Sequence, residues 1–286
     1  MDHLAVLLPD GVDRDDVLIW TTVVPLLAPT SAEQATEFSN TYWPTVYKKS
    51  NPFGPHPAIL ERAMSEIAPD TPKFLGMAKE VGQLAVKKGI GLPVGALIVD
   101  RSSGSPEIIS IAADARWQGQ PTDCKTGPGN VMAHAVLRAI GMVAQKLKRT
   151  GDKYAARRDF VRDEHEREVF SDRPLLGPEQ EISDLENISM DGYLCHGLEI
   201  YITHEPCIMC SMAILHSRFA RVIFGQRMPG TGGLSSESDA NTTEDCGGGL
   251  GYGLFWRKEL NWSLLGWEYK QKEVDPASIL KPFTHA

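Results

Sequence analysis

From Thr71 onwards, the hydrophobic positions of the chain alternate between helical spacing and short apolar runs. Apolar residues recur at three- and four-residue intervals between positions 74 and 85, up to Gly89. This spacing predicts an amphipathic helix that begins at the Thr-Pro pair of residues 71–72. Residues 93–100 and 107–113 are rich in branched and small apolar residues, which predicts a buried strand and its hairpin partner.

The same alternation continues towards the end of the chain. It predicts helices over residues 131–148 and 206–216, and strands over residues 198–203, 221–224 and 264–267. Helices that follow strands in this way can cover both faces of a sheet. The pattern therefore predicts an α/β fold in three layers, an α/β/α sandwich.

The first seventy residues follow a different pattern. Branched and aromatic residues at 17–24 predict a strand, and residues 31–38 predict a short helix. Prolines at 44, 52, 55 and 57 exclude a continuous regular element in between. We therefore predict a small N-terminal α+β domain over residues 1–70 and a larger α/β domain over residues 71–286.

A charged segment interrupts the larger domain. Residues 149–196 are dense in acidic and basic side chains and lack an evident core pattern. Such a composition is typical of a solvated segment that cannot bury enough apolar surface to pack. We predict a surface insertion here.

Composition and charge narrow the function classes. A formal net charge of −8 argues against a chain that binds nucleic acid by itself through a broad basic face, although a local basic patch remains compatible with it. Five cysteines form no disulfide-scaffold spacing, which favours a reducing compartment. The first twenty residues do not resemble a signal peptide, and no apolar run has the length of a bilayer span. We expect a protein of the cytoplasm, the nucleus or both, with no membrane partner.

Two short motifs have the spacing of metal ligands. His134 lies near the start of one predicted helix, and Pro206-Cys207 and Cys210 open another. One histidine and two cysteines can hold Zn²⁺ and leave its fourth position open, and helix N-termini favour the thiolate form that zinc requires. We predict a zinc site at His134, Cys207 and Cys210. The remaining cysteines have no partner spacing and receive no role: Cys124, Cys195 and Cys246.

Val136 occupies a position at which a known metal-binding motif has a glutamate. The spacing matches the H-x-E…P-C-x-x-C pattern of zinc-dependent nucleobase deaminases, in which the glutamate moves protons between the zinc-bound water, the ring and the leaving amine. Position 136 holds valine, which has no proton to move. The sequence thus predicts a metal site without the proton shuttle.

These motifs give the chain a resemblance to a known family. Residues 132–136, 204–218, 221–225, 251–254 and 260–261 resemble the tRNA-specific adenosine deaminases of the cytidine deaminase-like superfamily, and the resemblance covers residues 71–270. It implies a cytidine deaminase-like sandwich. In the eukaryotic members, one subunit keeps H-A-E and a homologous partner carries valine and an added N-terminal domain.

The resemblance implies a role as the non-catalytic member of such a pair. Val136 and the seventy preceding residues match the valine-bearing partner. It implies zinc binding, a heterodimer with a catalytic H-A-E subunit, participation in tRNA binding and no deaminase activity alone. Two alternatives stay open: a deaminase of a free base or nucleoside with a substitute proton carrier, and a zinc-stabilised scaffold protein.

Four residues outside the two motifs are candidates for further roles. Glu205 could replace the missing acid, but active members carry a glutamate at the same place, so a structural role is favoured. The fourth zinc ligand could be water, His285 or the C-terminal carboxylate if the tail folds back. His204 and Asp123 are further candidate proton carriers.

Basic residues suggest two candidate RNA contacts. Lys146, Lys148 and Arg149 cluster after the predicted zinc helix, where phosphate contacts would make binding salt-dependent. Lys48 and Lys49 lie among aromatic residues of the N-terminal domain, a combination typical of single-strand and loop binders. A solvated helix face and core packing of the aromatics are the respective alternatives.

Overall fold

The chain divides into two compact units, residues 1–53 and 54–286. The structure is a computed structural model, and it describes residues 21–25, 29, 32–46, 55–120, 127–154, 171–188, 193–235, 252–257, 259–270 and 278–286. The second unit begins before residue 70, where the sequence placed the boundary between two predicted domains. It therefore includes a helix that the sequence analysis left unassigned, α2 (Pro57–Ile67).

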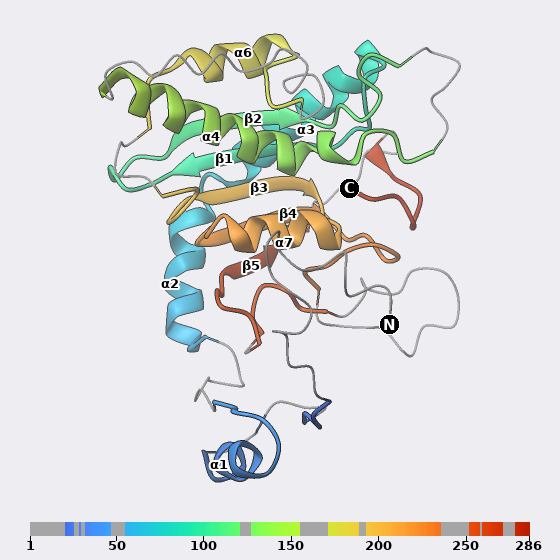
Figure 1. Cartoon of the computed structure of the whole chain (residues 1–286). Helices are drawn as coiled ribbons and strands as arrows, with labels where there is room; N and C mark the ends of the chain where they lie inside the picture. The colour runs from blue at the N-terminus through green and yellow to red at the C-terminus, as the bar shows by residue number, and fades with distance from the viewer. Residues whose placement is uncertain are drawn as a thin grey trace. The chain divides into compact units, whose positions relative to one another are not determined.

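A five-stranded mixed sheet forms the centre of the second unit (Figure 1). Its order is β2-β1-β3-β4-β5; β1 pairs antiparallel with both of its neighbours, and β3, β4 and β5 are parallel. The strands are β1 (Gly95–Asp100), β2 (Glu107–Ala113), β3 (Glu199–His204), β4 (Arg221–Gln226) and β5 (Leu265–Glu268). All five match strands that the sequence predicts, within a few residues at their ends.

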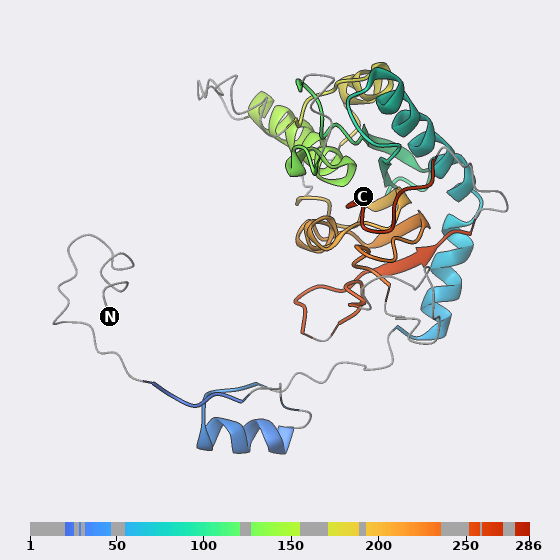
Figure 2. The ribbon, with the colours of Figure 1, turned by 90° about the vertical axis from the view of Figure 1, so that its right-hand side faces the viewer.

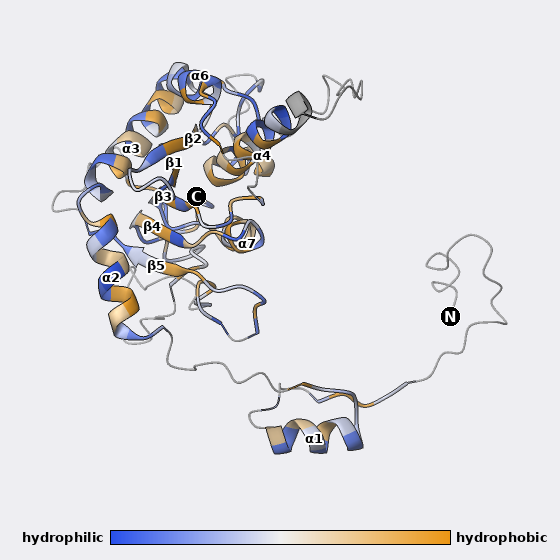
Figure 3. Cartoon of the chain, turned by 90° about the vertical axis from the view of Figure 1, so that its left-hand side faces the viewer, coloured by the Kyte–Doolittle hydropathy of each residue, from blue (hydrophilic) through white to orange (hydrophobic). Residues whose placement is uncertain are grey.

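Helices cover both faces of this sheet, which confirms the three-layer prediction. Figure 2 shows α4 (Ala135–Tyr154) and α7 (Ile208–His216) on one side, and α2 and α3 (Thr71–Lys88) on the other. Figure 3 shows the same layers coloured by hydropathy, with apolar segments in the strands and in α7.

The alternation of side chains along β1 explains the two cores. Ala96 and Ile98 pack in the apolar cluster beneath α4 and α7, whereas Leu97 and Val99 pack in the cluster beneath α3. Successive side chains of a strand point to opposite faces, and all four are fully buried. A strand buried on both faces appears in the sequence as the continuous apolar run from which it was predicted.

The close approach of α3 to the sheet requires glycine in β1. A Cβ atom at Gly95 would lie 1.8 Å from the carbonyl oxygen of Ala78. The helix ends as predicted at Gly89, whose φ of 67° is left-handed and whose amide donates to the carbonyls of Ala85 and Val86.

Among the described residues, no helix is long and apolar enough to cross a membrane.

The first unit contains α1 (Ala32–Thr41), which confirms the helix predicted over residues 31–38. The strand predicted over residues 17–24 is not confirmed. Residues 17–20 lie outside the described part of the chain, and residues 21–24 belong to no strand. Branched residues alone do not specify a strand, because strand propensity depends on a neighbouring strand and a buried face.

The prediction of a surface insertion over residues 149–196 is wrong for part of that segment. The helix α4 runs on to Tyr154, and a further helix, α6 (Gly177–Asp184), follows. Leu176, Glu179 and Cys195 are buried, and Leu176 belongs to the core beneath α3. Residues 155–170 lie outside the described part of the chain. The carboxylate of Glu179 is therefore paired inside the fold, with Arg138, rather than solvated.

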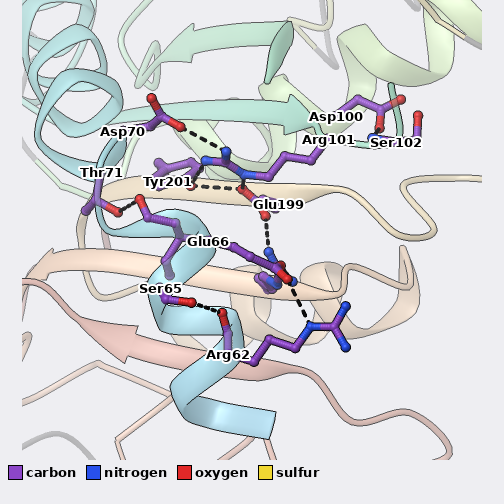
Figure 4. A network of polar contacts seen from close by, with 12 residues as sticks. Arg62, Ser65, Glu66, Asp70, Thr71, Asp100, Arg101, Ser102, Glu199 and Tyr201 are labelled. Carbon is purple, nitrogen blue, oxygen red and sulfur yellow. Dashed lines mark hydrogen bonds and ion pairs between the residues drawn. The ribbon is translucent and has the colours of Figure 1, made fainter. Parts of the chain in front are cut away.

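An ionic network anchors α2 to the sheet (Figure 4). At its centre the buried carboxylate of Glu199 accepts from Arg101 Nε at 2.8 Å and from Arg221 Nη1 at 2.7 Å. Arg101 also pairs with Asp70, which precedes α3, and Arg221 pairs with Glu66 of α2. The network joins the starts of β3 and β4 to the end of β1, at the opposite end of β3 from His204.

Candidate metal centre

The three predicted zinc ligands lie together in the interior. His134 lies between a short 3-10 helix, η4 (Val131–Ala133), and α4, while Cys207 caps α7 and Cys210 lies in its first turn. The ligand atoms of His134, Cys207 and Cys210 all lie within 4.8 Å of one another, and all three residues are buried. Residues more than seventy positions apart thus meet at two helix starts.

The distances between these atoms fit a tetrahedral zinc ion. His134 Nδ1 lies 3.5 Å from the Sγ atom of Cys210 and 3.8 Å from that of Cys207. Ideal Zn–N and Zn–S bonds at a tetrahedral angle would separate the two ligand atoms by about 3.6 Å. The side chains therefore need little rearrangement to hold the ion.

Cys207 and Cys210 share a proton in a way that favours a thiolate. A hydrogen bond from the Cys210 thiol lowers the pKa of Cys207 to about 3; burial opposes this shift, and His134 adds to it. The hydrogen bond with Cys207 and burial raise the pKa of Cys210. The site thus offers one thiolate readily, and a metal ion would displace the second proton.

Val136 lies in an apolar environment in the first turn of α4. Its side chain is 1% exposed and belongs to the same cluster as Cys207, Cys210 and Ala139. A cavity of about 510 Å³ opens beside His134 and Cys207. Among the described residues that line this cavity, none carries a carboxylate side chain.

The tail of residues 278–286 folds back over this cavity. Phe283, Thr284 and His285 form part of its wall. Several groups of the body donate hydrogen bonds to backbone carbonyls of the tail: Gly230 N to Pro282 at 3.0 Å, Thr231 Oγ1 to Thr284 at 2.7 Å, Cys207 N to Ala286 at 3.3 Å, and Arg116 to His285. His285 therefore lies in the cavity wall, but its ring nitrogens do not belong to the group of ligand atoms formed by His134, Cys207 and Cys210.

His204 and Glu205 have structural partners that explain their burial. Burial lowers the pKa of His204 and keeps it neutral, so that Nε2–H donates to the carbonyl of Ser278 at 2.8 Å. The carboxylate of Glu205 accepts from the amides of Met228, Leu234 and Ser235. Glu205 thus fixes the loop after β4, which agrees with a structural role. Asp123 lies outside the described residues.

The basic residues predicted to contact RNA differ in burial and in hydrogen-bond partners. Lys146 is buried and donates to Asn187 Oδ1 at 2.9 Å, and burial lowers its pKa to about 8. This contradicts the prediction of a phosphate contact at Lys146. Lys148 and Arg149 are exposed, and Arg149 donates to the carbonyl of Ser183. Lys48 and Lys49 lie outside the described residues.

Exposed apolar side chains lie in the cavity wall or next to residues of that wall in the sequence. We call this set the apolar rim: Val131, Met132, Ile208, Met209 and Phe283. Val131, Met209 and Phe283 line the same cavity, so these side chains form one surface. Exposed apolar surface of this kind is typical of protein–protein contacts.

The sequence analysis missed two buried ion pairs near the metal ligands. Arg116 binds Asp114 with its Nη2 atom 2.7 Å from Oδ2, and Arg138 binds Glu179 with its Nη1 atom 2.7 Å from Oε1. A regular spacing on α4 could have indicated the second pair, because Arg138, Gln145 and Arg149 recur on one side of the helix.

Comparison with known families defines the class of the protein. The family model for the zinc-binding region of cytidine and deoxycytidylate deaminases matches residues 69–226. The chain belongs to this family, which confirms the fold that the resemblance implied.

Individual relatives agree with this assignment. The chain is 27% identical over 273 residues to the tRNA-specific adenosine deaminase subunit tad3 of Schizosaccharomyces pombe, covering 92% of this chain and 65% of the relative. It is 26% identical over 260 residues to subunit TAD3 of Saccharomyces cerevisiae, covering 88% of this chain and 61% of the relative. The chain thus spans less than two thirds of the length of either relative.

One further relative and one solved structure match smaller parts of this chain. A probable inactive tRNA-specific adenosine deaminase-like protein 3 of Danio rerio is 33% identical over 132 residues, which cover 46% of this chain and 31% of the relative. A solved structure from studies of A-to-I editing by tRNA:A34 deaminases at the wobble position of transfer RNA is 17% identical. It has a TM-score of 0.40 and covers 69% of this chain and 98% of that chain.

Proposed function

We propose that the chain is a zinc-binding, non-catalytic subunit of a tRNA deaminase that converts wobble adenosine to inosine. The observation that carries the proposal is the buried His134, Cys207 and Cys210 cluster with Val136 at the position of the acid. The names of the tad3 relatives support the subunit role and the tRNA substrate.

Among the described residues that line the cavity, none carries a carboxylate side chain in place of the missing glutamate. A zinc ion would be held by His134, Cys207 and Cys210, and it would supply Lewis acidity at its open position. The hydrocarbon side chain of Val136 can neither accept a proton from water nor pass one to a leaving amine. General acid–base catalysis by one group accelerates a reaction by about 10²–10⁴-fold. We therefore expect the missing glutamate to lower the rate of deamination by at least this order.

Neighbouring titratable groups do not replace the acid. The carboxylate of Glu205 is fully buried and held by three backbone amides, and His204 is bound to the tail carbonyl of Ser278. These contacts support the non-catalytic subunit over a deaminase with a substitute proton carrier. The tail wall formed by Phe283, Thr284 and His285 also narrows access to the cavity.

The apolar rim supports dimerisation with a homologous H-A-E subunit. Its five side chains are exposed; four of them lie at the helix starts that carry the predicted metal ligands, and Phe283 lies in the tail. Burial of such a surface against a partner contributes about 25 cal/mol per Å² of apolar area. The retained zinc then has an architectural role, because it fixes the two helix starts from which the rim projects.

Contacts to tRNA are assigned to exposed cations outside the metal centre. Lys148 and Arg149 are exposed at the end of the described part of α4. Lys48 and Lys49 in the N-terminal unit are the second candidate pair. In this arrangement the partner's catalytic pocket takes the flipped base, while this chain helps to hold the body of the tRNA.

Coexpression with a homologous H-A-E deaminase chain tests the proposal. We expect the two chains to copurify in equal amounts and to form inosine in tRNA only together. Replacing the glutamate of the partner's H-A-E motif with glutamine should abolish inosine formation, while the same complex with this chain unchanged still binds tRNA. Inosine formation by this chain alone would overturn the proposal, and solitary behaviour would favour the scaffold alternative.

A charge in the apolar rim should weaken the complex. We expect Met209→Asp to raise the dissociation constant of the two chains by at least about tenfold, which corresponds to about 1.4 kcal/mol. Met64→Asp is the matched control, since Met64 is similarly exposed but lies on α2. The measurement is analytical ultracentrifugation together with the zinc content of each variant. Equal affinity of the two variants would place the interface elsewhere.

A further inference from the structure

Arg138 of α4 and Glu179 of α6 form an ion pair in the interior of the fold. Both side chains are 0% exposed, and the pair is bidentate, with Nη1–Oε1 at 2.7 Å and Nη2–Oε2 at 2.8 Å. Arg138 Nε also donates to the carbonyl of Ser171 at 2.9 Å, and its Nη atoms donate to the carbonyls of Ala113 and Arg173. Every nitrogen of the guanidinium group is thus engaged.

Glu179 connects this pair to the end of β2. Its carboxylate accepts from the amide of Ala113 at 2.8 Å, and from the amides of Leu175 and Leu176 at the start of α6. Together, Arg138 and Glu179 hold both the amide and the carbonyl of Ala113. The last residue of β2 is therefore fixed to the first turns of α4.

The segment of residues 171–187 lies closely against α4 along the same side. A Cβ atom at Gly141 would lie 2.9 Å from that of Asp172, whose carboxylate accepts from Gln145 at 2.6 Å. Further along α4, Lys146 donates to Asn187 and Arg149 donates to Ser183. Residues 171–187 of the charged stretch that the sequence suggested to be a surface insertion therefore pack against α4.

His134 depends on this region for its position. Its φ of −63° and ψ of 145° are extended, because it lies between η4 and α4. On one side of it, the carbonyl of Ala133 accepts from the amide of Ala115 at 2.9 Å. On the other side, the carbonyl of His134 accepts from the amide of Arg138 at 3.0 Å. Ala115 thus binds the residue before His134, and Arg138, whose amide binds the carbonyl of His134, also holds the carbonyl of Ala113 through its side chain.

Stability alone does not account for such a pair. Two charges lose several kcal/mol of hydration on burial, and apolar side chains of similar volume often replace a buried ion pair without loss. A bidentate arginine–carboxylate pair does fix a geometry, because its two parallel hydrogen bonds define both distance and angle.

We propose that Arg138 and Glu179 are positioning residues for the metal centre, which orient the start of α4 so that His134 Nδ1 faces the two thiolates. The segment of residues 171–187 then acts as a brace of the zinc site. This inference rests on the zinc binding of the proposed function. Groups that orient metal ligands from outside the coordination shell typically change metal affinity by about 10–100-fold.

The test compares Glu179→Gln with Glu199→Gln. Both carboxylates are buried and bind arginine, but Glu199 lies at the other end of β3, away from the metal ligands. We expect both variants to unfold at lower temperature. Only Glu179→Gln should raise the zinc dissociation constant, by about 10–100-fold, in competition with a chelator at a temperature where both variants are folded. The ligand-field spectrum of bound Co²⁺ should change in this variant alone.

The outcomes separate the inference from the proposed function. A wild-type chain that binds no zinc would overturn the proposed function. A wild-type chain that binds zinc, with an unchanged zinc dissociation constant and Co²⁺ spectrum in Glu179→Gln, would overturn the brace. If Glu179→Gln does not fold, Arg138→Lys gives the same comparison, because it keeps the charge and loses the bidentate geometry.

Discussion

Replacing His134 with alanine is expected to leave the purified chain with less than about one tenth of an equivalent of zinc, because two cysteines alone do not complete the three-ligand set. The loss should also lower the thermal stability. When free zinc exceeds its dissociation constant a thousandfold, binding stabilises the fold by about 4 kcal/mol. For a unit of this size, that corresponds to roughly 8–16 °C in the midpoint of thermal unfolding.

Cys195→Ala is the matched control for this experiment. Cys195 is as buried as the metal ligands, but it lies outside their cluster, and burial raises the pKa of its thiol to about 12. It should keep a full equivalent of zinc and lose only packing energy. Elemental analysis and calorimetry measure both quantities. Full zinc retention in His134→Ala would contradict the assignment of the site.

Restoring the acid by Val136→Glu is expected to give no inosine formation and to destabilise the fold. The side chain of Val136 is 1% exposed, packs against the apolar core and does not line the cavity. A carboxyl group placed there without hydrogen-bond partners should cost about 1–3 kcal/mol. The wall formed by Phe283 and Thr284 would still restrict the cavity.

Val136→Gln provides the neutral control, and denaturant unfolding together with an inosine assay on tRNA provides the measurement. Both variants should be less stable than the wild type, and neither should turn over. Inosine formed by Val136→Glu without a partner subunit would show that the cavity admits the substrate, and that valine is the only barrier to catalysis.

Local patterns were sufficient to predict the sheet, the main helices and the three residues that cluster as a possible metal site. A strand such as β1 is buried on both faces and therefore appears as a continuous apolar run, and Gly89 ends α3 as its position suggested. The cluster of His134, Cys207 and Cys210 was predictable because zinc binds particular side chains, and the short motifs that carry these side chains have a characteristic spacing. These constraints act over a few residues, so they are visible in the sequence.

Long-range charge pairing was not predictable in the same way. Lys146 suggested an RNA contact, but it is buried and donates to Asn187. Glu179 suggested solvent, yet it is fully paired inside the fold. A charged side chain has the same letter whether water or a distant partner neutralises it, and only the tertiary contact distinguishes the two.

The manner in which the body holds the tail has a consequence for how this part of the chain can vary. Hydrogen bonds to residues 278, 282, 284, 285 and 286 end on backbone oxygens, and among these described residues only Ser278 also accepts one on its side chain, from Gln226. Every amino acid offers such a carbonyl, so most side chains of the tail could be exchanged without loss of these bonds. A deletion or insertion of one residue would instead displace the carbonyls from their donors. Natural variation should therefore preserve the length of this segment more strictly than its composition.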